Sequence, residues 1–298
     1  MPVTPPFRHA WQIWARLFSS LVLFALAASP PPVCSQVVRI APKLGPCDPA
    51  LVEAGLDVSS LKDFGKLMAA EVDPMFAQME RTMRAQGRRL SAGERERVYA
   101  ILRQAFDADA LAQEVQLSMK SHCDSKVFAV AVEQLHAPLP TKIRAFEDAF
   151  NRAHSQAAVN RYAASLQRHP PGQQREALIA ALEKTVHQAD FTADIDAQVI
   201  LALYMGLTGQ PTNDAQFATI RDQLLPSVRQ ATRVELLMIY HNVSDEDLDQ
   251  YIMLLRTPAL QRFQTIYKSA LQNAIVRRSE VFAAMIKQYV DEARPARH

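Results

Sequence analysis

Apolar residues recur at every third or fourth position along most of this chain, which is the spacing of one face of an α-helix. One helix is predicted to start at Ser91 and Glu94, which form the S-x-x-E pattern of a capping box. Asp124 or Ser125 can cap the next helix to about His136, and a long helix continues past Pro138 to roughly residue 166. The first apolar face begins near residue 59 and consists of Leu61, Phe64, Leu67, Met68, Val72, Met75, Phe76 and Met79.

Signals for β-structure are weak. The chain has only eight glycines, and the hairpin dipeptides Asn-Gly, Asp-Gly and Gly-Gly are absent. The sequence therefore predicts an all-α fold, joined by Pro, Ser, Thr and Asp residues.

Two prolines lie inside amphipathic stretches and predict helix starts. Proline is favoured at the first position of a helix, where its missing N–H needs no partner, and Thr257 before Pro258 is a suitable N-cap. Because the residue before a proline is pushed out of helical geometry, a short helix (about 245–256) must end there and a long one (about 258–290) begin. Ala137 and Pro138 predict the same arrangement earlier in the chain.

The second half of the chain repeats the first at an offset of 120 residues. The two prolines coincide at this offset, and so do the helix-starting residues Asp124 and Ser244. The apolar positions also coincide, in the pairs Leu117 and Leu237, Phe128 and Leu248, Leu135 and Leu255, Ile143 and Phe263, and Phe146 and Ile266. We therefore predict an internal duplication into two related antiparallel helical-bundle units, residues 59–168 and 169–298, with Pro170-Pro171-Gly172 at the boundary.

The N-terminal segment predicts export. Residues 1–47 contain no acidic residue, and Arg8 and Arg16 precede an apolar run of about a dozen residues. This run is shorter than the ~20 residues of a membrane span and has the layout of a cleaved signal peptide, residues 1–35, with cleavage after Ala27 or Ser35. A retained membrane anchor is the alternative. Residues 36–58 are expected to form an N-terminal arm, and the mature chain is expected in the periplasm or outside the cell.

Export changes the interpretation of charge and cysteines. The chain has 33 basic and 31 acidic residues, and loss of residues 1–35 removes two basic ones and leaves the charges balanced, which argues against nucleic-acid binding. Cleavage after Ser35 also removes Cys34, so Cys47 and Cys123 remain. Two cysteines in an oxidising compartment predict a disulfide, the alternative being two free, buried thiols.

The segment from Tyr240 to Ile266 resembles the bacterial domain-of-unknown-function family 2059. The matching positions are Tyr240, Ser244, Glu246, Leu248, Thr257, Pro258 and Gln261. Two positions differ from the family pattern, because Leu260 replaces the usual Gly and Leu254-Leu255 replaces an aromatic pair. The resemblance implies an exported helical protein and, through the repeat, a degenerate first copy around Leu117–Phe150. It implies no catalytic residue.

Candidate catalytic and metal sites are few. The common phosphate, dinucleotide, hydrolase, zinc-protease and C-x-x-C motifs are absent. His241 precedes the acidic cluster 245–249, in which Asp245, Glu246, Asp247 and Asp249 could bind a metal ion or transfer protons, but acidic residues in a first helical turn also complement the helix dipole. The adjacent His122 and Cys123 are a weaker candidate for a nucleophilic pair.

These observations predict an exported, non-enzymatic interaction protein that needs no cofactor or metal. Long paired helices offer grooves for a protein or apolar partner. The final helix carries Arg277, Arg278 and Lys287 and could contact a membrane surface, but its apolar face favours packing on the bundle. The alternative is an enzyme or metal-binding protein with its site near His241.

Overall fold

The computed structural model describes residues 47–59, 61–62, 64–85, 89–153, 156–208 and 210–293, and the expected signal peptide lies outside this part of the chain. Within the described ranges the fold is all-helical, without a β-strand. The helices are α2 (Pro49–Val58), α3 (Phe64–Ala85), α4 (Ala92–Ala105), α5 (Ala108–His122), α6 (Ser125–Leu135), α7 (Pro138–Ala153), α8 (Gln156–Arg168), α9 (Gln173–Val186), α10 (Gln188–Thr208), α11 (Asp214–Ile239), α12 (Asp245–Leu255) and α13 (Pro258–Ala293).

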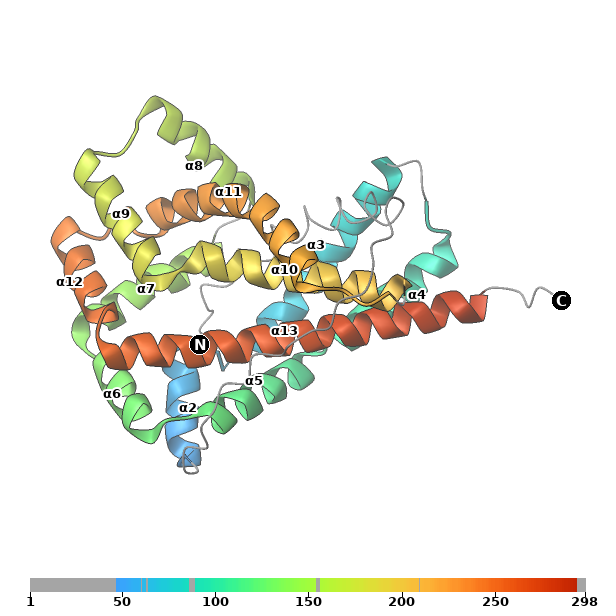
Figure 1. Cartoon of the computed structure of the whole chain (residues 1–298). Coiled ribbons are helices and arrows are strands. Elements are labelled where there is room, and N and C mark those ends of the chain that lie inside the picture. Colours follow the sequence, from blue (N-terminus) through green and yellow to red (C-terminus); the bar gives the residue numbers. More distant parts are fainter. Residues whose placement is uncertain are drawn as a thin grey trace.

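The long C-terminal helix α13 organises the molecule (Figure 1). It runs along the length of the fold, with α10 along one side and α5 along the other, and it also packs on α4 and α6. No helix of the described residues is long and apolar enough to cross a membrane.

Helices α6 and α12 begin at the predicted capping residues. The Asp124 carboxylate accepts hydrogen bonds from the backbone N–H groups of Lys126 (3.1 Å) and Val127 (3.2 Å). The Ser244 hydroxyl accepts one from the N–H of Asp247 (3.1 Å). Each cap satisfies N–H groups that the first turn of a helix leaves without partners.

The two prolines begin helices, as their sequence context predicts. Pro138 is the first residue of α7 and Pro258 the first residue of α13. The Thr257 carbonyl accepts the first helical hydrogen bond, from Gln261 N (3.0 Å), but its hydroxyl donates to Gln134 Oε1 on α6 (3.1 Å). The Thr257 side chain therefore joins the two halves of the chain.

The structure differs from the sequence prediction in two places. Residues 49–58 of the expected arm form α2, whose Val52, Leu56 and Val58 are buried in the core. The helix that begins at Pro138 ends at Ala153, and a separate helix, α8, covers residues 156–168. Pro49 at the start of α2 plays the same helix-starting role as Pro138, so the same sequence signal was present there.

The structure joins Cys47 to Cys123 by a disulfide with a Cα–Cα distance of 6.0 Å. Cys47 precedes α2 and Cys123 is the C-cap residue of α5, so the bond fastens the start of the described chain to the α5–α6 corner. Both cysteines are buried. A disulfide in a folded protein indicates an oxidising compartment.

Helices of both halves share one hydrophobic core. At its centre the rings of Phe128 on α6 and Phe263 on α13 make an edge-to-face contact with centroids 5.0 Å apart. Helix α2 approaches this pair through Gly55, where a Cβ atom would lie 2.9 Å from the Phe128 ring. A larger residue would push α2 off the aromatic pair.

Replacing either helix-starting proline by Ala is expected to cost little. Because neither Pro138 nor Pro258 lacks a hydrogen bond that its position needs, the loss should be only about 0.4–1 kcal/mol, from a more flexible unfolded chain. Pro226, inside α11, is the matched control, since a proline in a helix interior removes a hydrogen bond. In urea unfolding, Pro226→Ala should raise the free energy of unfolding, which is the opposite of the effect expected at Pro138 and Pro258. Clear stabilisation by Pro138→Ala and Pro258→Ala would refute their role as helix starts.

Candidate functional site

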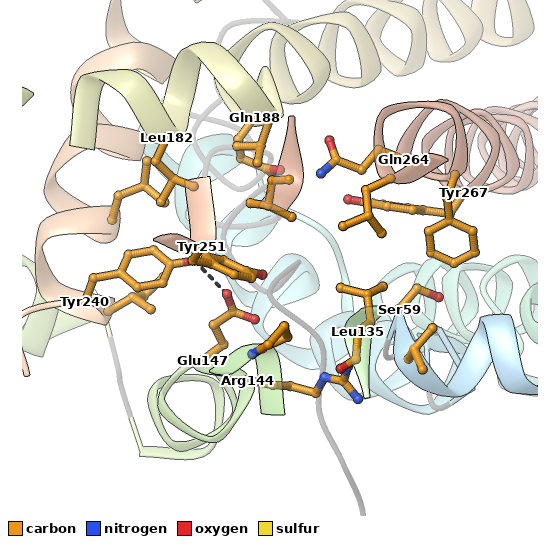
Figure 2. Close-up of a pocket in the computed structure, with 18 of the residues that line it drawn as sticks. Ser59, Leu135, Arg144, Glu147, Leu182, Gln188, Tyr240, Tyr251, Gln264 and Tyr267 are labelled. Atoms are coloured by element: carbon orange, nitrogen blue, oxygen red, sulfur yellow. Dashed lines mark hydrogen bonds between the residues drawn. The ribbon is translucent and has the colours of Figure 1, made fainter. Parts of the chain in front are cut away.

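A cavity with a volume of about 150 Å³ lies where the first turns of α7 and α13 meet α9–α12 and the end of α2. Apolar and polar side chains share its wall (Figure 2). The lining residues are Val58, Ser59, Leu135, Pro140, Arg144, Glu147, Leu182, Val186, Gln188, Thr192, Thr232, Glu235, Leu236, Ile239, Tyr240, Tyr251, Leu255, Leu260, Phe263, Gln264 and Tyr267.

The two proline-initiated helices contribute to the wall at positions that are 120 residues apart. Eight lining residues form pairs that are 120 positions apart, namely Leu135 and Leu255, Pro140 and Leu260, Arg144 and Gln264, and Glu147 and Tyr267. The first two pairs are apolar in both halves. In the other two pairs, a charged residue of the first half corresponds to an uncharged residue of the second half.

Glu147 is the acidic group of α7 at the cavity. The Tyr240 hydroxyl donates a hydrogen bond to Glu147 Oε1 over 2.6 Å, across 93 residues of sequence. Burial raises the pKa of the Glu147 carboxyl, against the opposing effects of this hydrogen bond and of the positive charge on Arg144. Among the described residues, no basic side chain forms an ion pair with Glu147.

Three tyrosines line the same cavity as this carboxyl. Burial raises the pKa of Tyr240, Tyr251 and Tyr267, and the negative charge on Glu147 raises each of them further. The Tyr240 hydroxyl is bonded to Glu147, and Figure 2 shows Tyr251 beside this carboxyl and Tyr267 on the other side of the cavity, near Gln264. The tyrosines therefore remain neutral at physiological pH.

The remaining polar groups are held by the helices. Arg144 donates from Nη2 to the Leu135 carbonyl (3.0 Å), which ties its guanidinium to the end of α6. Gln264 on α13 is buried, and Figure 2 shows its amide on the side of the cavity near Gln188. Gln188 follows His187, whose left-handed conformation (φ 48°) ends α9 and lets α10 begin at once.

The acidic cluster that follows His241 lies outside this cavity and is used in packing. Asp245 pairs with Arg175 (2.6 Å) and Asp247 with Lys142 (2.6 Å), so that two carboxylates fasten α12 to α9 and α7. His241 Nδ1 is 2.6 Å from the Met238 carbonyl oxygen. No group of His, Cys, Asp or Glu side chains suited to a metal ion occurs in the part of the chain that the structure describes.

The other predicted candidates also have structural partners. Cys123 is in the disulfide, and His122 Nδ1 contacts the Ser118 carbonyl (2.9 Å), so the two do not form a nucleophilic pair. On α13, Arg278 pairs with Glu114 of α5 (2.5 Å). The apolar face of α13 packs on the core, through Ile275, Phe282, Met285, Ile286 and Tyr289.

Two further polar features lie elsewhere. Asp196 on α10 is buried, neither of its oxygens has a hydrogen-bond partner among the described residues, and burial raises its pKa well above the usual value. A second hollow lies beside α9, where Arg233 pairs with Glu176 and Arg229 with Asp190 (3.5 Å). Its charges neutralise one another, so the cavity around Glu147 is the stronger candidate.

Comparison with known proteins gives no further identification. No family model, curated protein or solved structure matches the chain. The resemblance of residues 240–266 to the family named above therefore stays a prediction, and the functional argument rests on the cavity.

Proposed function

We propose that this chain is an exported, non-enzymatic binding protein of the bacterial envelope, built from two copies of one helical unit. The cavity between the copies holds its ligand or a side chain of its partner. The observation that carries the proposal is the wall of this cavity, where corresponding positions of the two proline-initiated helices converge around a half-buried carboxyl.

The positions of the helices support the duplication. Helices α6 and α12 both have 11 residues, and the first and last residues of α12 lie 120 positions after those of α6. The start of α13 likewise lies 120 positions after the start of α7. The packing corresponds as well, since α2 packs on α6 as α9 packs on α12, and α3 on α5 as α10 on α11. Helix α11 occupies the place of both α4 and α5, and its Pro226 corresponds to Phe106, the C-cap residue of α4.

The composition of the cavity supports binding. A duplicated helical unit could fill the space between its copies with apolar residues, and replacing buried charges in this way often stabilises a protein. This chain instead keeps Glu147, Arg144 and Gln264 at the wall and leaves space between them. Groups that are unfavourable for folding and converge on a cavity are typical of binding sites.

The disulfide supports the proposed location of the chain in the periplasm or outside the cell. Disulfides persist in the periplasm and outside the cell, whereas cytosolic thiols are kept reduced. Together with the predicted signal peptide, this bond is the basis for proposing export to the envelope.

Filling the cavity is expected to abolish binding. Thr232 is buried on α11 and lines the cavity, so Thr232→Phe should occupy much of the free space. The mature protein would be isolated from envelope extract without denaturation and its bound ligand or partner measured by native mass spectrometry. We expect Thr232→Phe to retain less than about a tenth of the bound species, since steric exclusion removes the binding energy.

The matched control is Met253→Phe, which places the same ring on an exposed position of α12. This variant should bind as the unmodified protein does. Thermal unfolding of both variants shows whether the fold is intact. Equal recovery of a bound species by folded Thr232→Phe and by Met253→Phe would place the binding surface elsewhere.

A further inference from the structure

Helix α10 packs on α11 through a small apolar cluster that is separate from the main core. The cluster consists of Ala189, Ala193, Leu224, Leu225 and Val228. Asp196 belongs to the same face of α10, because positions 189, 193 and 196 follow the spacing of one helical face. Its side chain is 1% exposed, and among the described residues neither of its oxygens has a hydrogen-bond partner. A carboxyl group without a partner is therefore buried in the contact between α10 and α11.

The charged groups of α10 and α11 along this contact bind one another. Asp190 and Asp194 of α10 accept hydrogen bonds from Arg221 of α11, over 2.9 and 2.5 Å. Arg229 of α11 lies 3.5 Å from Asp190, and Asp222 of the same helix is exposed and lies 3.8 Å from Arg221. None of these groups forms a hydrogen bond or an ion pair with the buried carboxyl.

Helix α13, which also packs on α10, directs its basic groups to other places. Lys268 donates to the Val186 carbonyl, Arg277 and Arg278 pair with Glu114 of α5, Lys287 pairs with Asp291, and Arg262 is exposed. Ionised Asp196 would therefore lie in the closed contact without a counter-charge from α10, α11 or α13. An unpaired buried charge is strongly unfavourable.

The first half of α11 is weakly attached to the rest of the molecule. Of residues 214–225, only Leu224 and Leu225 are buried. Pro226 follows inside the helix, where a proline removes one helical hydrogen bond. Beyond it, from Val234 onward, α11 belongs to the main core. Residues 214–225, which we call the flap, are therefore separated from the anchored part of α11 at the weakest point of the helix.

We infer that the flap is a pH-sensitive element, which is closed over α10 while Asp196 is protonated and lifts at Pro226 when Asp196 ionises. Lifting the flap admits water to the carboxylate, whereas the ionised group has no partner in the closed contact. The inference goes beyond the proposed function, since it involves neither the cavity nor a ligand.

The direction of the pH dependence follows from burial. Burial raises the pKa of Asp196 well above its usual range, and no charged group of the described residues contributes to this shift. The closed state therefore holds the proton more tightly than the open state. Closure is complete below the usual pKa of an aspartate, about 4, and is lost progressively as the pH rises towards the raised pKa.

Hydrogen exchange followed by mass spectrometry tests this element in the unmodified protein. After correction for the intrinsic pH dependence of exchange, protection of the flap amides should fall about tenfold per pH unit above pH ~4 and below the raised pKa, because opening releases one proton. Amides of residues 228–239, which lie beyond Pro226, should keep their protection over the same range.

Three variants assign the effect to Asp196. Asp196→Asn keeps the size of the side chain but cannot ionise, so protection of the flap should no longer depend on pH. Asp196→Leu replaces the carboxyl by an apolar group and should keep the flap closed at every pH, which provides a second test if the Asn variant does not fold. Asp249→Asn removes a carboxyl from an exposed position of α12 and should retain the full pH dependence. Thermal unfolding shows which variants are folded.

Three results would overturn the inference. Protection of the flap that does not change with pH in the unmodified protein would show that ionisation of Asp196 does not open the contact. An unchanged pH dependence in a folded Asp196 variant would assign the effect to another group. Equal loss of protection before and after Pro226 would show that α11 opens as a whole and that the flap does not exist.

Discussion

Loss of the Cys47–Cys123 disulfide is expected to lower the free energy of unfolding by about 4–5 kcal/mol. The two cysteines have a sequence separation of 76, and a cross-link over a loop of this length strongly restricts the unfolded chain. The bond also holds the chain before α2 against the α5–α6 corner. Urea unfolding of the double variant Cys47→Ser, Cys123→Ser, compared with the oxidised protein, measures the effect.

The control for this prediction is chemical reduction. A reducing agent should destabilise the disulfide-bonded protein to a similar extent and should have no effect on the double variant. Because each new serine is also buried in place of sulfur, part of the loss in the variant comes from the hydroxyl groups. Equal stability of the oxidised and reduced proteins would show that the two cysteines are not bonded in solution.

Truncation of the central aromatic pair is expected to have the second large effect. Phe128 is fully buried and packs edge to face on Phe263, which comes from the other half of the chain. Phe128→Ala should lower the free energy of unfolding by about 3–5 kcal/mol, because it removes a large apolar side chain and leaves a space that rigid helices cannot close. Denaturant unfolding followed by circular dichroism measures the loss.

A double-mutant cycle tests whether this pair couples the two halves. The losses for Phe128→Ala and Phe263→Ala should be non-additive by about 0.5–1.5 kcal/mol, the contribution of one aromatic contact. Met253→Ala, at an exposed position of α12, is the control and should change stability by less than about 0.5 kcal/mol. Two separate unfolding transitions, with Phe128→Ala affecting only one, would contradict a single shared core.

Local sequence rules were sufficient to predict the helix boundaries that capping residues and first-turn prolines mark. Pro138, Pro258, Asp124 and Ser244 were assigned to helix starts from their neighbours alone, and the structure places them there. These assignments succeed because caps and first-turn prolines act within four residues of the helix end. The role of the Thr257 side chain was missed because its partner, Gln134, is 123 positions away.

The cavity could not be derived in the same way. Glu147 has no local feature that distinguishes it from other residues of an amphipathic helix. Tyr240 is one of the positions that resemble family 2059, but nothing near it indicates its partner, which is 93 positions away. Glu147 and Tyr267 are separated by the 120-residue offset of the predicted repeat, but the comparison of capping and apolar positions did not include this pair. That the space between them stays open depends on how helices of both halves pack, which no single segment specifies.

The length of α13 has a consequence for when the protein can fold. Its 36 residues span roughly 54 Å and cover α4, α5, α6 and α10, so a segment synthesised after all the other described helices completes the core of the first half. The helices of the first half therefore emerge from the ribosome with an apolar face uncovered, and they cannot close around Phe128 until Phe263 is available. A first half that stays open until α13 has been synthesised is in the state in which a polypeptide can still be threaded through a narrow channel.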